Sequence, residues 1–341
     1  MKKMLDTVYV LTPDSYLFHR NENLCVSIGG EEKASIPAHQ IDALVVFGKH
    51  TFSTSLLGFC GKHNITLTFL SEGGFFEGRL CGPVSGNVLL RKRQYESMGE
   101  REFSERFVRD LLYCKILNGK RVLLRSARGS QDEEVREELN HGAEQLSKLA
   151  SDLSNCKDVD SMRGVEGAAA TAYFGKFDLM LSSPAGFRFE TRSRRPPLNE
   201  VNALLSFLYT LLAHDTVSAL ETVGLDPAAG YLHTLRPGRS SFALDLMEEL
   251  RAPLCDRLAL AMLNKGELSN KTFQRDSLSV TLNDKGRKKV LTQWKARRQE
   301  TIQHPFLKET IPIGLIPYTQ AMLFARVLRG DLDRYPPFMW R

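Results

Sequence analysis

The sequence predicts an α+β protein with two domains, a small β-rich N-terminal domain over residues 1–85 and a larger domain, all or nearly all α-helical, over residues 86–341. Before residue 85, apolar and polar residues alternate with a period of two within short segments, which is typical of half-buried strands. From residue 87 onward, apolar residues recur every three or four positions, which is typical of amphipathic helices. The length of 341 residues and the 42% hydrophobic content are sufficient for two hydrophobic cores.

The N-terminal domain is expected to contain short strands and one helix. Candidate strands cover residues 7–12, 16–20, 24–28, 43–47, 65–70 and 76–81. A Glu72-Gly73-Gly74 turn is expected before the last strand, and Gly82-Pro83 is expected to close the domain. Between residues 53 and 63, Ser53 is a candidate cap and the apolar residues follow helical spacing, which predicts one helix there.

The second domain is expected to consist of successive helices. They cover residues 89–98, 103–126, 130–155, 161–177, 198–223, a segment that begins at 240 or 241, 284–299 and 318–329. Gly119 is expected to bend the second of these helices, because glycine costs about 1 kcal/mol in a helix interior. Residues 187–197 are expected to form an arginine-rich loop, and residues 278–282 a short strand.

Composition and charge limit the class of protein. The formal net charge of +6 is compatible with a polyanionic partner. No run of 18 apolar residues is present, so no membrane-spanning segment is predicted, and the first residues lack the apolar region of a secretion signal. Six scattered cysteines without a C-x-x-C pair indicate buried, reduced thiols of a cytosolic protein rather than a zinc site or a disulfide framework.

Several common catalytic motifs are absent from the chain. There is no Walker loop, no G-x-G-x-x-G after a strand, no H-E-x-x-H and no G-x-S-x-G. Nucleotide hydrolysis, dinucleotide redox chemistry and serine hydrolysis therefore have no support, and the candidates that remain are acids and histidines of the helical domain.

The segment 233–251 carries the densest group of candidate functional residues. His233 precedes a Pro-Gly turn and a helix on which Asp245 and Glu248 are three residues apart, so their carboxylates share one face. Arg251 continues that face, which favours a site for a cation and an anion together. The alternative interpretation is a surface helix with an ordinary ladder of charges at i,i+3 spacing.

Glu166 is a second candidate, because it lies in an otherwise small and apolar stretch, Arg163-Gly-Val-Glu-Gly-Ala-Ala-Ala. A carboxylate in such a stretch is either a charge near solvent or a buried group with a partner, since unpaired burial of a charge is costly. The residue by itself does not decide between these two alternatives.

Four blocks together resemble the CRISPR-associated spacer-acquisition integrase family (Cas one). They are residues 163–170 around Glu166, residues 194–207 from Arg194 through Asn202, residues 224–233 ending at His233, and residues 238–251 with Asp245 and Glu248. The order, spacing and residue types of all four blocks match together. The β-rich N-terminal domain is also similar to the N-terminal domain of that family.

The resemblance implies a metal-dependent DNA endonuclease and integrase with an α-helical catalytic domain. It implies that Glu166, His233 and Glu248 hold the metal, and that Asp245 matches a further acidic position. The family works as a homodimer, and two such dimers flank a dimer of the small partner Cas two in a heterohexamer. This complex inserts prespacer DNA into the CRISPR repeat array, in the cytoplasm of a prokaryotic cell.

The implied ligands suit hard divalent cations, and one imidazole among carboxylates favours Mn²⁺ while remaining compatible with Mg²⁺. Three protein ligands leave coordination positions free for water and a phosphate oxygen, which favours polarisation of a phosphodiester. The nucleophile is a DNA 3′-hydroxyl in integration and water in nuclease action. His233 is alternatively a general acid or base, and the sequence does not separate this role from ligation.

Basic residues are the candidates for DNA contacts. Arg194, Arg195, Arg239 and Arg251 lie inside the matching blocks and are expected to reach phosphates near the metal, although a solvated loop is the alternative for Arg194 and Arg195. The basic helix over 285–298 either follows the DNA backbone or is a solvated face. Tyr173 either lines the site or belongs to the core. Asn202 is either a buried hydrogen-bonding group or a partner of the metal ligands.

Two other functions remain as alternatives to the integrase. A catalytically idle DNA-binding or assembly scaffold of the same fold has no chemical need for Glu166, His233 and Glu248 together. An unrelated metal-dependent nuclease does not explain the four blocks in register.

Overall fold

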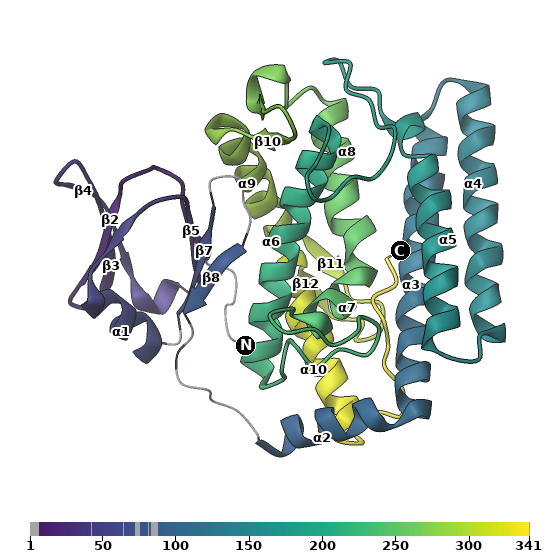
Figure 1. Ribbon diagram of the computed structural model, residues 1–341, viewed down its shortest axis with the longest axis horizontal. Helices are drawn as coiled ribbons and strands as arrows, with labels where there is room; N and C mark the ends of the chain where they lie inside the picture. Colours follow the sequence, from purple (N-terminus) through teal and green to yellow (C-terminus); the bar gives the residue numbers. More distant parts are fainter. Residues whose placement is uncertain are drawn as a thin grey trace. The chain divides into compact units, whose positions relative to one another are not determined.

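The computed structural model describes residues 7–41, 43–63, 65–71, 76–80, 82 and 88–340. The chain divides into two compact units, which we call unit 1 (residues 1–85 and 282–300) and unit 2 (residues 86–281 and 301–341). A strand-rich N-terminal region is followed by a helical region (Figure 1), which confirms the predicted fold class. The expected turn at Glu72-Gly73-Gly74 and the closure at Pro83 lie outside the described residues.

Unit 1 contains two four-stranded sheets and helix α1. In the first sheet the order is β1 (Thr7–Val10), β5 (Ala43–Phe47), β7 (Thr66–Leu70) and β8 (Phe76–Leu80), with β1, β5 and β7 parallel and β8 antiparallel to β7. In the second the order is β4 (Glu31–Pro37), β3 (Asn23–Ile28), β2 (Tyr16–Arg20) and β6 (Thr51–Phe52). Helix α1 (Thr54–Lys62) begins where Ser53 Oγ accepts a hydrogen bond of 3.2 Å from the Leu56 amide, as the cap prediction requires.

Strands β4 and β6 were not predicted. Strand β4 begins with three exposed charged residues, Glu31, Glu32 and Lys33, and lies at the edge of its sheet, so its sequence lacks the alternation of a half-buried strand. Strand β6 has only two residues, which is too short to give a periodic signal.

Helix α9 (Asp284–Gln299) has the predicted bounds but belongs to unit 1, whereas the sequence placed it in the second domain over 86–341. Its Arg298 guanidinium donates a hydrogen bond of 3.1 Å to Thr7 Oγ1 in β1, which ties the end of the helix to the first sheet. Periodicity carries no information on which core a helix joins, so this assignment needed the tertiary structure.

Unit 2 is built mainly from helices (Figure 1). They are α2 (Val88–Gly99), α3 (Arg101–Gly129), α4 (Glu133–Asp152), α5 (Val159–Gly175), α6 (Glu200–Val223), α7 (Ser241–Leu250), α8 (Arg257–Asn264) and α10 (Ile316–Leu328). Strand β9 (Phe273–Arg275) pairs with β10 (Val280–Leu282), and β11 (Thr301–Gln303) pairs with β12 (Thr310–Pro312). The helices α3, α4 and α5 pack against one another, and α3 also packs against α7.

Gly119 does not interrupt α3, which is continuous over Arg101–Gly129. A Cβ atom at Gly119 would lie 3.4 Å from the ring of Tyr173 in α5, so glycine permits a close approach of the two helices. A π-helical segment, Arg251–Asp256, joins α7 to α8. Pro253 within this segment lacks the amide hydrogen of a regular turn, which accounts for the widened helix.

Helix α6 alone among the described helices is long and apolar enough to cross a membrane, by length and composition only. In its most apolar window, 61% of the residues are buried inside unit 2, where α6 packs against α7 and α10. This burial identifies α6 as a core helix. Of the five described cysteines, all are free thiols and four are buried, while Cys156 is partly exposed.

Candidate active site

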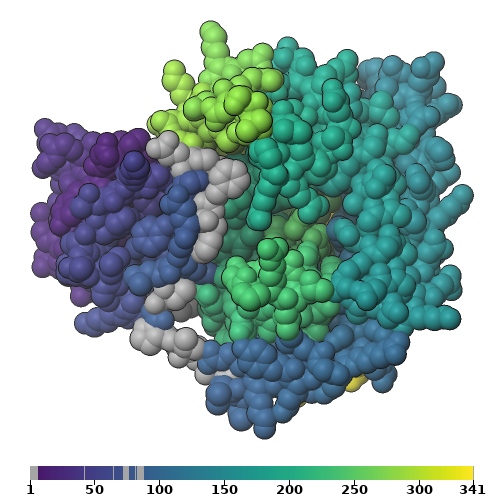
Figure 2. Space-filling model, in the orientation of Figure 1, coloured from purple at the N-terminus to yellow at the C-terminus, as the bar shows by residue number. Residues whose placement is uncertain are grey.

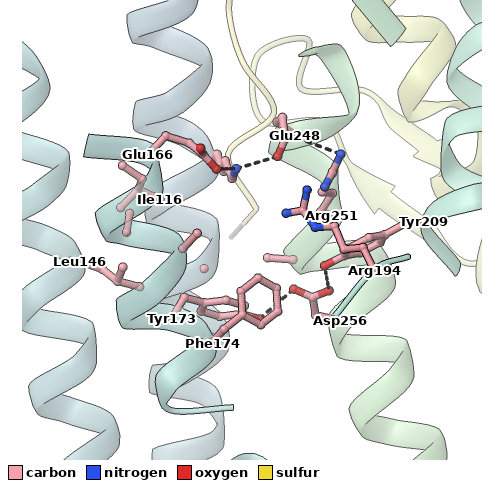
Figure 3. Close-up of a pocket in the computed structure, with 15 residues that line it drawn as sticks. Ile116, Leu146, Glu166, Tyr173, Phe174, Arg194, Tyr209, Glu248, Arg251 and Asp256 are labelled. Carbon is pink, nitrogen blue, oxygen red and sulfur yellow. Dashed lines mark hydrogen bonds and ion pairs between the residues drawn. The ribbon is translucent and has the colours of Figure 1, made fainter. Parts of the chain in front are cut away.

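Three segments of unit 2 bring the predicted metal ligands together. Glu166 lies in the middle of α5, Glu248 lies in the last turn of α7, and His233 lies in the loop that precedes α7. Glu166 and Glu248 face each other across the pocket drawn in Figure 3. His233 Nε2 lies 4.0 Å from Oε1 of Glu248.

A lysine of α3 lies between the two glutamates. Lys115 Nζ is 2.8 Å from Oε2 of Glu248 and donates a short hydrogen bond to Oε1 of Glu166. The space between the two carboxylates therefore accommodates a cationic group. Lys115 was missed in the sequence, although a single charge between Cys114 and Ile116 is the same kind of signal that singled out Glu166.

Glu248 is ionised although it is buried. Burial by itself raises the pKa of a carboxyl group, but the positive charges of Arg251 and Lys115 outweigh this effect and lower the pKa of Glu248 to about 2. The guanidinium of Arg251, three residues along the chain, lies 3.0 Å from Oε1 of Glu248. The shared face predicted for Glu248 and Arg251 is thus a buried ion pair rather than a solvated ladder.

Asp245 has a different environment from Glu248. It is fully buried, and its Oδ2 accepts hydrogen bonds from the amides of Tyr231 (2.6 Å) and Leu232 (2.9 Å). Its Oδ1 accepts from the amide of His233 at 2.9 Å and lies 2.6 Å from Nδ1 of the same residue. Both oxygens of Asp245 are therefore directed to the loop, and the carboxylate holds His233 in place.

Gly230 allows the loop to approach α7 closely. A Cβ atom at this position would lie 2.7 Å from Cβ of Ser241 and 2.9 Å from Oδ2 of Asp245, distances that ordinary side chains do not show. Ser240 occupies the N-cap position of α7, but its side chain makes no capping hydrogen bond. Instead the carbonyl of Pro227 accepts hydrogen bonds from the second and third amides of α7, Phe242 and Ala243, at 2.8 and 3.1 Å.

A buried aspartate with two tyrosines lines the other side of the pocket (Figure 3). Asp256 accepts hydrogen bonds from the hydroxyl groups of Tyr173 (2.9 Å) and Tyr209 (2.6 Å). Burial raises the pKa of Asp256 to about 6, although both tyrosine hydroxyls stabilise its charge. Tyr173 therefore belongs to the core and lines the site as well, while Asp256 gave no signal in the sequence.

The four candidate DNA-binding arginines fall into two groups. Arg194 and Arg195 are exposed, and Arg194 lines the pocket. Arg239 and Arg251 make internal contacts: Arg239 donates to Oγ1 of Thr234 at 3.0 Å, and the Arg251 guanidinium lies 5.0 Å from the ring centre of Tyr209.

Asn202 is a buried group that organises the arginine-rich loop. Its Oδ1 accepts hydrogen bonds from Arg192 (2.8 Å) and from the amide of Ser193 (3.1 Å), and its Nδ2 donates to the carbonyl of Thr191 (2.8 Å). These bonds support the first of the two alternatives, a buried hydrogen-bonding residue. They also hold the backbone next to Arg194.

The residues of the site suit a divalent cation in their chemistry. Two carboxylates and an imidazole are ligands of Mn²⁺ and Mg²⁺, and the ammonium of Lys115 already lies where a cation would bridge Glu166 and Glu248. Among the described residues, no three His, Cys, Asp or Glu side chains are close enough together to hold a metal as they stand. A cation that bridged Glu166 and Glu248 would take the place of the Lys115 ammonium.

Comparison with known proteins identifies a class of CRISPR-associated endonucleases. The family described as CRISPR associated protein Cas1 matches residues 8–296. A curated relative from Rhodospirillum rubrum, named CRISPR-associated endonuclease Cas1 2, is 47% identical over the full length of both chains. The chain belongs to the Cas1 family. This confirms the predicted family and the predicted class of enzyme, an endonuclease.

Two solved structures share the fold. A CAS1 protein from Thermotoga maritima matches with a TM-score of 0.85 and 23% identity over 97% of this chain and 99% of the other. A casposase bound to its integration product matches with a TM-score of 0.84 and 18% identity over 98% of this chain and 94% of the other. The arrangement of strand-rich and helical regions is therefore the fold of these proteins.

Proposed function

We propose that this protein is a metal-dependent DNA endonuclease and integrase of CRISPR adaptation, which inserts prespacer DNA into the CRISPR repeat by transesterification at phosphodiesters. The observation that carries the proposal is the ionised Glu248 that faces Glu166 across a cation-sized space, with Nε2 of His233 at its edge. A divalent metal requirement follows from membership of the family, with Mg²⁺ or Mn²⁺ as the ion.

Glu166, His233 and Glu248 would hold the metal. When bound, the ion supplies polarisation of the scissile phosphodiester and of the attacking hydroxyl or water. Asp245 keeps Nδ1 of His233 occupied, so that Nε2 is the nitrogen directed to the ligand position. Arg251 is locked against Glu248 and Tyr209, which orients its charge toward the pocket in which phosphate is expected.

Arg194 has a complementary role at the mouth of the same pocket. Its side chain is exposed, while the bonds of Asn202 fix the backbone beside it. A side chain on a fixed backbone binds a DNA phosphate without first ordering the loop, which lowers the entropic cost of binding. Arg195, also exposed, would contact the next part of the DNA backbone.

The proposed partners are those that the resemblance to the Cas1 family implies. They are prespacer duplex and CRISPR repeat DNA, a second copy of this chain, and Cas2, in a heterohexamer of two Cas1 dimers and one Cas2 dimer. The casposase of similar fold is bound to an integration product, which is compatible with strand transfer by this chain. The location is the cytoplasm of a prokaryotic cell.

A strand-transfer assay tests the proposal. Purified protein and Cas2 are incubated with Mn²⁺ or Mg²⁺, a supercoiled plasmid that carries the repeat array, and a short duplex with free 3′-hydroxyls. The expected product is relaxed plasmid joined to the duplex, lost in EDTA and in Glu248→Gln. The matched control is Glu144→Gln, because Glu144 is exposed on α4 outside the site.

Binding of the duplex separates the integrase from the scaffold. The integrase requires that Glu166→Ala and Glu248→Gln keep duplex binding and lose joining. Joining by these variants at the level of the wild type would overturn the site assignment. Absence of joining by the wild type, with duplex binding intact, would favour the idle DNA-binding scaffold.

A further inference from the structure

The loop between His233 and Arg239, here called the 233–239 loop, presents an apolar side chain to solvent beside the proposed catalytic centre. Leu235 is 63% exposed and lies two residues after His233. The segment that contains this loop is at the surface of unit 2, coloured green in Figure 2. We propose that Leu235 is a wedge that inserts between stacked bases of the target DNA next to the attacked phosphodiester.

The ends of the loop are fixed, which distinguishes Leu235 from a leucine in a mobile segment. At one end the amide of His233 donates to the buried carboxylate of Asp245 at 2.9 Å. At the other, Arg239 donates to Oγ1 of Thr234 at 3.0 Å, and Ser241 donates to the carbonyl of Thr234 at 3.2 Å. The carbonyl and hydroxyl oxygens of Thr234, directly before Leu235, are thus bound within the protein.

The tip of the loop is held as a turn. The amide of Arg239 donates to the carbonyl of Arg236 at 3.1 Å, and Gly238 has a φ of +73°, a conformation that favours glycine. Pro237 restricts the backbone further. A side chain presented from a restrained turn loses little conformational entropy when it enters a ligand.

The chemistry of the tip suits a DNA duplex. An apolar side chain flanked by the exposed, positively charged Arg236 resembles the wedges with which proteins unstack base steps while basic residues bind the backbone. Two residues of chain reach about 7 Å, which corresponds to about two base steps of 3.4 Å. A base step within this reach of a phosphodiester bound at His233 is the one into which Leu235 would insert.

The wedge adds a substrate-positioning residue to the proposed function and rests on it. An unstacked step gives the backbone the freedom to turn its phosphate toward Glu166 and Glu248, and the burial of Leu235 between bases offsets part of the unstacking cost. Single exposed leucines are common on protein surfaces, so the test needs a leucine that is at least as exposed and lies away from the site. Leu278, 77% exposed in the same unit, is that control.

The direct test is base unstacking, measured with 2-aminopurine in a target duplex at the base step next to the attacked phosphodiester. Full-length protein with Cas2 and Mn²⁺ is expected to raise the fluorescence on binding. Leu235→Ala is expected to abolish most of this rise, Leu235→Met to restore it, and Leu278→Ala to leave it unchanged. An equal rise with Leu235→Ala would overturn the wedge.

A second measurement tests whether insertion of Leu235 contributes to strand transfer. Leu235→Ala is expected to lower strand transfer about tenfold on a fully paired target and to regain the wild-type rate on a target with a mismatch at that base step. Equal loss on both targets would show a structural defect and overturn the wedge. If the wild type joins no DNA, the proposed function fails, while the fluorescence still decides whether Leu235 unstacks the duplex.

Discussion

Asp245 holds His233 through two different atoms of the histidine. One carboxylate oxygen accepts from its backbone amide at 2.9 Å and lies 2.6 Å from Nδ1 of its ring. The ring nitrogen Nδ1 therefore carries the hydrogen that faces the carboxylate, and Nε2 is left to act toward Glu248. The position and the tautomer of the imidazole depend on one buried residue outside the proposed ligand set.

Asp245→Asn is expected to weaken both folding and catalysis. The amide nitrogen cannot accept the hydrogen bonds that the carboxylate receives from Tyr231, Leu232 and His233, so at least one buried amide loses its partner. We expect the free energy of unfolding to fall by about 1–3 kcal/mol and strand transfer to fall about 10–100-fold. Urea denaturation and the joining assay measure these effects, with the exposed Asp333→Asn as control. Wild-type values for both would contradict the role of Asp245.

Lys115 is expected to compete with the metal. In Lys115→Met the carboxylates of Glu166 and Glu248 lose the cation that lies between them, so the metal-free protein is less stable and the metal enters without displacing an ammonium. We expect the increase in Tm on addition of Mn²⁺ to be larger in the variant than in the wild type. Differential scanning fluorimetry with and without Mn²⁺ measures this increase. The exposed Lys148→Met is the control, and an increase no larger than that of the wild type would disprove the competition.

Gly230→Ala is expected to disturb the site from a position outside it. The added methyl group would lie 2.7 Å from Ser241 and 2.9 Å from a carboxylate oxygen of Asp245, so the loop or α7 must shift. We expect a loss of about 1–3 kcal/mol in the free energy of unfolding, together with reduced strand transfer. Gly164→Ala is the matched control, because its Cβ would meet open space on α5 and alanine favours helix by about 0.5–1 kcal/mol. Equal free energies of unfolding for Gly230→Ala and Gly164→Ala would contradict the close approach of the loop to α7.

Asp256 is expected to make stability depend on pH. Its pKa is raised from 3.8 to about 6 in the folded state, so between these values the folded protein binds a proton that the unfolded chain has released. Its contribution to stability is present below about pH 4 and is lost as the pH rises through 6, by about 3 kcal/mol in total. In the Asp256→Asn variant, the free energy of unfolding is not expected to fall over this pH range, because asparagine does not titrate. Urea denaturation between pH 4 and pH 7 measures the difference between the two proteins, and parallel pH profiles would refute the shifted pKa.

The sequence predicted the regular elements well where a single period dominates. The helix over 284–299 has the predicted bounds, and strands such as 43–47 were visible as continuous apolar runs. Strand β4 was missed because its exposed edge carries Glu31, Glu32 and Lys33 in place of alternating apolar residues. The membership of α9 in unit 1 was missed because a helix has the same period whichever core it covers.

The candidate site was only partly visible in the sequence. The four blocks that resemble the Cas1 family pointed to Glu166, His233 and Glu248. The i,i+3 spacing placed Asp245 on the same helix face as Glu248, which suggested that both acids belong to one site. In the structure, Asp245 turns to the amides of residues 231–233, and Glu248 turns to Lys115 and Arg251. Helical spacing gives the face of a side chain but not the partner that its atoms meet.

The sequence by itself determined the fold class, most of the long helices, the family and the residue types available for metal chemistry, because these depend on local periodicity and on blocks of chain. The tertiary structure decided that Lys115 lies between Glu166 and Glu248, and that Asp256 is buried between Tyr173 and Tyr209. Residues 115 and 166 come from different helices. Their contact, and the charge state that it imposes, exist only once α3, α5 and α7 pack together and exclude water.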